Sequence, residues 1–292
     1  MLNGKIMPSD SACLNYDNRG FLWGDSFTVQ LRGNSCIVYD FKNYFQCICK
    51  MLESICMETD DSFKAKIFAN DLKLLLRKNR IYKEFCATIT FFRNSTGTNK
   101  LADTNTFSTL VSVESLPHEF YSINKEGIFT DIFDASQLGI GISNPNFSYD
   151  LICGKILAEK ELDDLIVTDN DGNYRRSLYS DIFFLKDNSL IYASDPENVS
   201  INAVFSSRIM QIANRKLGME IYQSTVNNSK LKVVDGMFLA DPVNGIRWVV
   251  GLGRERFYIG KVNDIAYEVY KYYKEDIEKI KEMFPYDDNL LM

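Results

Sequence analysis

Two adjacent arginines, Arg175 and Arg176, lie in a polar segment between two apolar stretches of the chain. A guanidinium group is planar and can bind a carboxylate or a phosphate through two parallel hydrogen bonds. The surrounding residues are rich in hydroxyl groups, which suits a segment that faces a cavity. Arginines in such a segment are suited to a small anionic ligand. The alternative is that both arginines are solvated residues of a surface hairpin.

The region from Asp164 to Ile191 must position these arginines. Residues 165–168 are apolar or β-branched, and an Asn-Asp-Gly turn follows them. Residues 182–185 form a second apolar run, and Asp187-Asn188 leads into a third. Asp-Gly and Asp-Asn steps between such runs are strong hairpin signals. The pattern predicts three successive strands joined by turns.

Few other side chains suggest catalysis or metal binding. The seven cysteines are scattered, and Cys47 and Cys49 are too close in sequence for the usual zinc knuckle. The single histidine, His118, follows a proline in an expected linker, and no hydrolase triad can be assembled around it. We therefore expect reduced thiols in a cytoplasmic protein, and no metal.

The composition limits the classes of partner. The chain has 292 residues, of which 46% are hydrophobic and 25% charged, and a formal net charge of −6. Phosphate backbones and anionic lipids attract basic surfaces, so this balance argues against nucleic-acid and membrane partners. The chain has no apolar run of about 18 residues, so we expect no membrane span. Its first residues do not resemble a signal peptide.

The order of expected elements predicts an α+β protein. We expect an N-terminal α+β domain over residues 1–115, a linker over 116–123 and a C-terminal domain over 124–292. The first domain is expected to contain strands at 2–7, 26–31, 36–39, 85–93 and 106–114, and helices at 41–57 and 60–78. The second is expected to contain strands at 127–133, 165–168, 182–185, 220–223, 236–240 and 247–250, and helices at 148–162, 200–217 and 262–283.

Three strings, in the same order along the chain, resemble motifs of the class IV (fold type IV) pyridoxal-phosphate aminotransferases. Residues 18–27, NRGFLWGDSF, resemble the family's RGFxYGDGxFE. Residues 171–183 resemble its DGxxxEGxxxNIF hairpin, and residues 235–246 resemble its late strand ADExFLT followed by GI. The family includes branched-chain and D-amino acid aminotransferases and aminodeoxychorismate lyase. Because the strings are collinear, the resemblance extends over nearly the whole chain.

The resemblance implies the two-domain fold of D-amino acid aminotransferases. This fold has a smaller N-terminal α/β sandwich and a larger C-terminal domain whose β-barrel-like core is flanked by helices. It also implies a homodimer, or a heterodimer with an active family member. In the family a lysine forms a Schiff base with pyridoxal phosphate, an acid keeps the pyridine nitrogen protonated, and an arginine and backbone amides hold the phosphate.

This sequence departs from the family at the catalytic positions. Tyr149 matches the family's tyrosine, and the lysine position then holds Asn144, or Pro145 with a one-residue slip; neither forms an imine. Lys155 lies on the next helix, and helical spacing directs it toward solvent. The position of the acid holds Arg176, whose charge disfavours a protonated pyridine nitrogen.

The positions that would hold the phosphate differ as well. The family's phosphate arginine falls near Cys47, which cannot replace it. Ser200 is retained at a helix start, where it could cap the helix and bind an anion. The late Thr-Gly-Thr becomes Ala240-Asp241-Pro242, which loses hydroxyls and adds a negative charge.

Three hypotheses result. The first is a pseudoenzyme that binds no cofactor and holds a small anionic ligand in the former cofactor pocket. The second is a divergent but active aminotransferase or lyase that uses pyridoxal phosphate through Lys125, Lys155 or Lys160. The third is a subunit that dimerises with an active relative, which exposed apolar surface on the first domain would favour.

Overall fold

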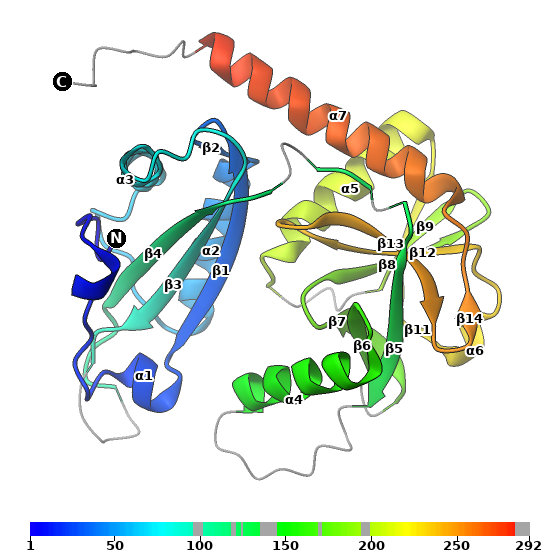
Figure 1. The fold of residues 1–292 in the computed structure, drawn as a ribbon, viewed down its shortest axis with the longest axis horizontal. Coiled ribbons are helices and arrows are strands. Elements are labelled where there is room, and N and C mark those ends of the chain that lie inside the picture. The colour runs from blue at the N-terminus through cyan, green and yellow to red at the C-terminus, as the bar shows by residue number, and fades with distance from the viewer. Residues whose placement is uncertain are drawn as a thin grey trace. The chain divides into compact units, whose positions relative to one another are not determined.

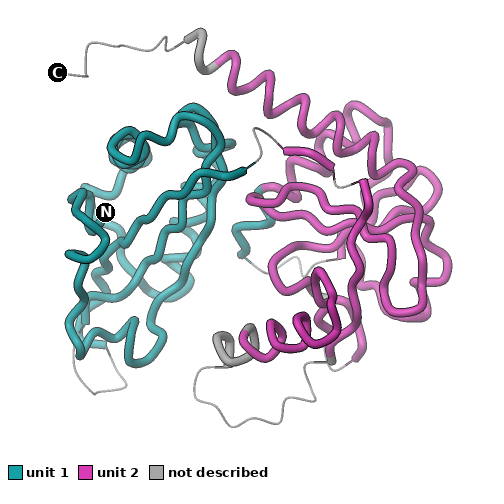
Figure 2. The backbone as a smooth tube through the Cα atoms, in the orientation of Figure 1, with its two compact units in different colours: residues 1–120, 199–204 teal, residues 121–198, 205–292 magenta. Residues whose placement is uncertain are grey.

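The computed structural model describes residues 1–95, 102–117, 121–123, 125–134, 145–168, 171–193 and 199–283, except for the side chains of residues 134, 145–150, 175 and 280–283. The chain forms two compact units (Figure 2). The first contains Met1–Phe120 and Val199–Val204, and the rest of the chain forms the second. The short segment Val199–Val204 lies far along the sequence, yet Ile201 and Val204 pack against the core of the first unit.

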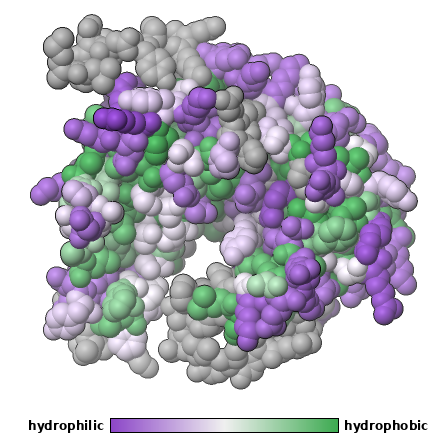
Figure 3. Space-filling model, in the orientation of Figure 1, coloured by the Kyte–Doolittle hydropathy of each residue, from purple (hydrophilic) through white to green (hydrophobic). Residues whose placement is uncertain are grey.

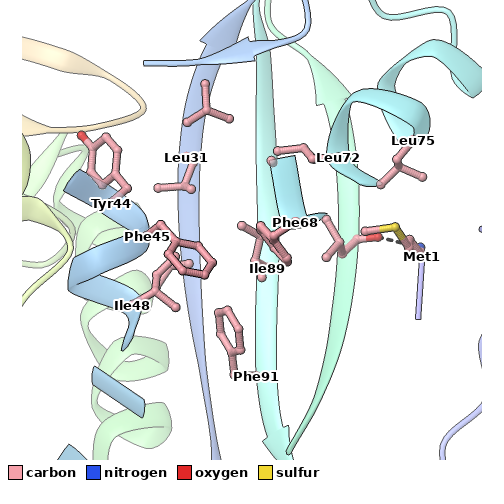
Figure 4. Packing of buried hydrophobic residues seen from close by; sticks show 14 of the residues in the cluster. Met1, Leu31, Tyr44, Phe45, Ile48, Phe68, Leu72, Leu75, Ile89 and Phe91 are labelled. Carbon is pink, nitrogen blue, oxygen red and sulfur yellow. Dashed lines mark hydrogen bonds between the residues drawn. The ribbon is translucent and has the colours of Figure 1, made fainter. Parts of the chain in front are cut away.

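The first unit is a four-stranded antiparallel sheet with two helices packed on one face (Figure 1). The strand order is β2-β1-β3-β4. The strands are β1 (Ser26–Asn34), β2 (Ile37–Val38), β3 (Phe85–Arg93) and β4 (Phe107–Ser115), and the main helices are α2 (Phe41–Ser54) and α3 (Ala65–Lys78). In Figure 4, Phe45 and Ile48 from α2 and Phe68 and Leu72 from α3 converge with Ile89 and Phe91 of β3.

The start of α3 differs from the prediction. The helix begins at Ala65 and not at Asp60. The Asp60 carboxylate accepts hydrogen bonds from the backbone N–H groups of Ser62 (2.8 Å) and Phe63 (3.2 Å). A carboxylate that bonds the backbone two residues ahead stabilises a turn in competition with a helix. Residues 2–7, expected as a strand, form isolated bridges only.

The string NRGFLWGDSF forms a short helix, α1 (Arg19–Trp23), and the turn after it, following the 3-10 turn η1 (Ser9–Ser11). Asn18 caps α1 by accepting a hydrogen bond from the N–H of Phe21 (3.3 Å). Asp25 then accepts from Arg19 Nε (2.9 Å) and from Arg93 Nε of β3 (3.0 Å). The string therefore anchors α1 to the sheet through ion pairs.

A buried carboxylate links β1 to the start of β3. Glu84 is fully buried and accepts hydrogen bonds from Arg32 Nε (2.5 Å), Asn34 Nδ2 (2.8 Å) and the Tyr39 hydroxyl. Burial, followed by the neighbouring Glu84 charge, raises the pKa of Tyr39. A carboxylate without water is stabilised by such charge-assisted bonds.

The β1–β2 hairpin turns one residue pair later than predicted. The expected strands at 26–31 and 36–39 leave residues 32–35 for the turn, but Gly33 and Asn34 pair with Val38 and Ile37 and belong to the strands. The turn lies at Ser35 and Cys36, which have φ values of 53° and 62°. Gly33 is needed for close approach, because a Cβ there would lie 2.2 Å from the Ile37 carbonyl oxygen.

Gly33→Ala is expected to destabilise the first unit by about 1–3 kcal/mol, since the methyl group would force the hairpin backbone apart. Urea unfolding measures the shift. Gly154→Ala is the matched control: a Cβ there meets nothing within 4 Å, and alanine favours the helix by about 1 kcal/mol. Equal midpoints for the Gly33 variant and the wild type would contradict the close approach.

The second unit is built on one curled sheet of ten strands, in the order β10-β9-β8-β12-β13-β5-β6-β7-β11, with β14 paired to β13 (Figure 1). The strands are β5 (Ile128–Asp134), β6 (Asp164–Thr168), β7 (Asn173–Ser177), β8 (Asp181–Lys186), β9 (Ser189–Ala193), β10 (Glu220–Gln223), β11 (Val226–Asn227), β12 (Gly236–Asp241), β13 (Gly245–Leu252) and β14 (Glu255–Arg256). The curl brings β7 close to β8 and β9, and the N–H of Ser177 donates to the carbonyl of Ser180 (2.9 Å) within the turn between β7 and β8.

Helices cover the sheet of the second unit. They are α4 (Pro145–Lys160), α5 (Asn202–Leu217), α6 (Asn228–Leu231) and α7 (Gly260–Met283). α4 starts at Pro145, earlier than expected, because proline suits the first position of a helix. α7 packs its apolar stripe on β12, and hydrophilic residues predominate along its outer side (Figure 3). No helix in the described part of the chain is long and apolar enough to cross a membrane.

Candidate functional site

Arg176 lies on the outer face of the curled sheet. It pairs with Val167 on β6, whereas its neighbour Ser177 pairs with the core residue Ile166. Successive residues of a strand face opposite sides, so Arg176 points away from the core. Its side chain is exposed, and Nη1 donates to the Leu178 carbonyl (2.9 Å). Arg176 is therefore an exposed residue whose guanidinium is held by a neighbouring backbone oxygen.

A β-bulge sets this orientation. Thr168 pairs with Tyr174 and Val167 with Arg176, which leaves Arg175 as the additional residue of β7. Because of this extra residue, Tyr174 and Ser177 are both buried although they are three positions apart. The side chain of Arg175 lies outside the described part of the structure.

Cys47 and Ser200 are brought together in the first unit. Cys47 on α2 donates through Sγ to the carbonyl oxygen of Ser200 (3.4 Å), and burial raises the pKa of its thiol. The Ser200 hydroxyl accepts a hydrogen bond from the N–H of Asn202, the first residue of α5 (3.3 Å). These two positions thus join Val199–Val204 to α2 and hold the start of α5.

Asp241 and Pro242 form a tight turn after β12. Asp241 is buried, and its Oδ1 accepts from the N–H groups of Val243 (3.0 Å) and Asn244 (2.8 Å). The Pro242 carbonyl accepts from the Tyr121 hydroxyl. The negative charge that the sequence adds here is consequently bound by the protein's own amides.

An ion pair that sequence reasoning missed lies on the core side of the same sheet. Asp164 is fully buried, and Arg247 Nη2 lies 2.5 Å from its Oδ2. Arg247 also donates to Ser180 Oγ (2.9 Å), which in turn donates to Asp241 Oδ2 (2.7 Å). Arg247 pairs across the sheet with the core residue Leu239, so it faces inward. The sequence does contain one indication of this ion pair, because Arg247 is a charged residue inside the otherwise apolar run 245–252.

A second buried carboxylate, Asp181, lies near Asp241. Asp181 Oδ2 accepts from the hydroxyls of Tyr192 and Ser206, each at 2.7 Å. Burial raises the pKa of Asp181, and the charge of Asp241 contributes in the same direction. Asp181 and its hydroxyl partners are buried among core residues, so its carboxylate is engaged by the protein's own hydroxyl groups.

The three lysines considered for Schiff-base chemistry are all exposed. Lys155 forms an ion pair with Glu159 one turn along α4 (3.7 Å), in agreement with its predicted orientation. Lys160 pairs with Asp131 (2.7 Å). Asn144 lies outside the described residues, as does the side chain of Tyr149. Within the described residues, no three His, Cys, Asp or Glu side chains are grouped to bind a metal ion.

Comparisons with known proteins agree on the fold. No protein-family model and no curated protein matches the sequence. The branched-chain aminotransferase of Thermoproteus uzoniensis superposes with a TM-score of 0.78 at 11% identity, covering 97% of this chain and 96% of that one. The Escherichia coli branched-chain amino acid aminotransferase gives 0.77 at 13% identity, with 91% of each chain covered.

A third similar structure is a putative 4-amino-4-deoxychorismate lyase from Legionella pneumophila, with a TM-score of 0.75 at 13% identity over 92% of this chain and 97% of that one. The chain thus has the two-domain fold of the class IV aminotransferases, as the collinear strings predicted. Within that fold it resembles both branched-chain aminotransferases and aminodeoxychorismate lyase, and its low identity to each marks it as divergent.

Arg247→Met is expected to destabilise the second unit by about 3–5 kcal/mol, because Asp164 would remain buried without its cation. Urea unfolding measures the loss. Adding Asp164→Asn should restore part of it, since the amide keeps an acceptor for the backbone N–H groups. Arg254→Met, at an exposed position, should change stability by less than about 0.5 kcal/mol. A single variant as stable as the wild type would refute the importance of the pair.

Asp181→Asn is expected to change how stability depends on pH. Because the pKa of Asp181 is raised, the folded state binds the carboxyl proton more tightly than the unfolded state does. The stability that this proton adds to the folded state is fully present below about pH 3.9 and is lost as pH rises through the raised pKa. The variant should therefore gain stability relative to the wild type between acid and neutral pH. Urea midpoints measured as a function of pH test this prediction, and parallel curves for the variant and the wild type would exclude it. Asp264→Asn, at an exposed position of α7, serves as the control.

Proposed function

We propose that this chain keeps the aminotransferase fold without the pyridoxal-phosphate chemistry, and that it binds a small carboxylate or phosphate anion through Arg176. The observation that carries the proposal is the exposed guanidinium of Arg176 at the position where the resemblance places an acid. An accessible guanidinium offers paired N–H donors to such an anion.

The residues at this position do not fit pyridoxal phosphate. The cofactor withdraws electrons from a substrate when its pyridine nitrogen is protonated, and a nearby carboxylate favours that state. Arg176 carries the opposite charge, and its Nη1 donates to the Leu178 carbonyl. A cation facing the ring nitrogen would favour the unprotonated form.

The lysines support the same proposal. An amine that forms an imine at neutral pH is usually desolvated or placed beside another cation, which lowers its pKa. Lys155 and Lys160 instead are exposed and pair with carboxylates. Both amines are therefore solvated and paired with a carboxylate, unlike a desolvated lysine that forms an imine.

The positions compared with the phosphate site support it as well. Cys47 supplies a thiol that donates to a carbonyl, where the family has an arginine. Asp241 supplies a carboxylate, and its oxygens already accept from Val243, Asn244 and Ser180. A phosphate dianion would be repelled by this charge and would find no guanidinium at Cys47.

The purified protein, mixed with pyridoxal phosphate, is expected to show no internal-aldimine absorbance band and no adduct after borohydride reduction. A band that borohydride bleaches would overturn the proposal. In that case Lys125→Ala, Lys155→Ala and Lys160→Ala would identify the reacting amine.

Arg176→Gln is expected to weaken the binding of inorganic phosphate about tenfold, equivalent to about 1.4 kcal/mol, measured by calorimetry at constant ionic strength. Arg254→Gln removes an exposed arginine elsewhere in the second unit and should leave the affinity unchanged. Equal affinities for wild type and Arg176→Gln would remove Arg176 from the proposed site.

A specific observation also favours a partner subunit. Consecutive apolar side chains on α1 are exposed: Phe21 by 75%, Leu22 by 42% and Trp23 by 45%. Tyr16, just before α1, is 87% exposed. Exposed apolar clusters of this kind often mark protein interfaces. We propose that this surface of the first unit forms a homodimer contact.

Replacing both Phe21 and Trp23 with serine is expected to convert a dimer into a monomer in sedimentation velocity. Tyr258→Ser, at an 82% exposed position of the second unit, should leave the dimer intact. A wild-type protein that sediments as a monomer at high concentration would contradict the homodimer.

A further inference from the structure

A cavity of about 420 Å³ lies beside α3, and all of its lining residues belong to the first unit. Small-molecule sites typically enclose about 300–1,000 Å³ and combine an apolar wall with a few polar groups. None of the residues that line it occupies a position compared above with the cofactor site of the fold.

One wall of the cavity is aromatic. Phe63 lies edge-on to Phe68 (5.7 Å between ring centroids) and to Phe107 (5.3 Å). Phe68 is part of the core of the unit, so these rings are held in place by packing. Ile67 lines the cavity from α3 and is 47% exposed. This wall offers fixed apolar surface to a ligand.

Asp71 lies one turn along α3 from Ile67 and presents a carboxylate to the same cavity. No hydrogen bond or ion pair engages Asp71 among the described residues, and burial raises its pKa. Gly4 allows the chain to pass closely, because a Cβ there would lie 3.2 Å from Asp71 Oδ2. A half-buried carboxylate without a cation is stabilised when one is supplied.

The other charged groups that line the cavity are already engaged or directed elsewhere. Asp60 accepts from Ser62, and Glu58 accepts from Asn105 Nδ2 (3.0 Å). The amino group of Met1 donates to the Val111 carbonyl (2.7 Å; dashed in Figure 4). Lys64 is exposed, and no ion pair joins it to Asp71 in the described part of the chain. Among the described carboxylates that line the cavity, Asp71 is thus the one that accepts no hydrogen bond.

We propose that this cavity binds a small organic cation, whose ammonium group pairs with Asp71 and whose apolar body packs on Phe63 and Phe107. The carboxylate supplies charge complementarity, and the ring faces supply both hydrophobic and cation–π attraction. An amine that carries a short aromatic or branched aliphatic group matches this arrangement. The site is independent of the anion site at Arg176, and either can exist without the other.

Phenethylamine, titrated into the full-length protein, is expected to shift the backbone amide resonances of residues 63–71 in heteronuclear NMR spectra. Phenethyl alcohol, which lacks the charge, should bind at least tenfold more weakly, as should phenethylamine to Asp71→Asn. Asp61→Asn removes an exposed carboxylate beside the cavity-lining segment and should leave the affinity unchanged. Ile67→Trp, at an exposed position, should fill the cavity and abolish binding without entering the core.

Three results would overturn the proposal: no shifts up to about 10 mM amine, shifts confined to residues away from the cavity, or equal affinity of the amine for wild type and Asp71→Asn. Equal binding of phenethyl alcohol and phenethylamine would have the same effect, because it would show that charge makes no contribution. Asp71→Asn is nearly isosteric and removes a partly desolvated charge, so it is expected to fold.

Discussion

Each unit of this protein buries a carboxylate that is bound by an arginine. Removing an ionised group from water costs several kcal/mol, which only an opposite charge and well-placed hydrogen bonds offset. In the second unit Asp164 on β6 meets this requirement through Arg247 on β13 and through the N–H of Leu178 beyond β7. In the first unit Glu84 does so through Arg32. Strands that are distant in sequence are thereby held in one register.

The same constraint explains why the curled sheet closes where it does. Ser180 donates to Asp241 and accepts from Arg247, so the segment between β7 and β8 is tied to the ends of β12 and β13. The inward charges are thus balanced by hydrogen bonds within the unit. Arg176, on the opposite face of β7, is excluded from that network by strand alternation. One face of β7 thus belongs to the buried hydrogen-bond network through Ser177, and the opposite face carries the exposed Arg176.

Much of the fold was predictable because its signals are local. The strand Phe85–Arg93 was predicted residue for residue from its apolar and β-branched composition, and α5 ends at Leu217 as expected, before Gly218 with its φ of 62°. The strings that resemble the aminotransferases shape the backbone: Asn18 caps α1, and Arg19 and Arg93 share Asp25. Because these residues shape the backbone, they identified the fold at 11–13% identity to the solved structures.

What the sequence did not predict depends on distant residues. The Asp164–Arg247 pair joins positions 83 apart, and no local pattern encodes it. The cavity beside α3 combines the first residues of the chain with α3 and β4, and the bulge at Arg175 becomes visible only in the pairing of β6 with β7. The start of α3 was missed because the Asp60 side chain competes for backbone N–H groups.

The assignment of Val199–Val204 to the first unit affects how the protein can be made. Ile201 and Val204 can join the core of the first unit only after strands β5 to β9 of the second unit have been synthesised. A nascent chain that has emerged only to residue 120 therefore lacks two of the apolar side chains that cover this core. Neither unit is a continuous stretch of sequence, and separating the chain after residue 120 would leave the first unit without Val199–Val204, whereas the second unit would keep all of its residues. The first unit can therefore be completed during translation only after much of the second unit has been synthesised, because Val199–Val204 lies between two stretches of the second unit.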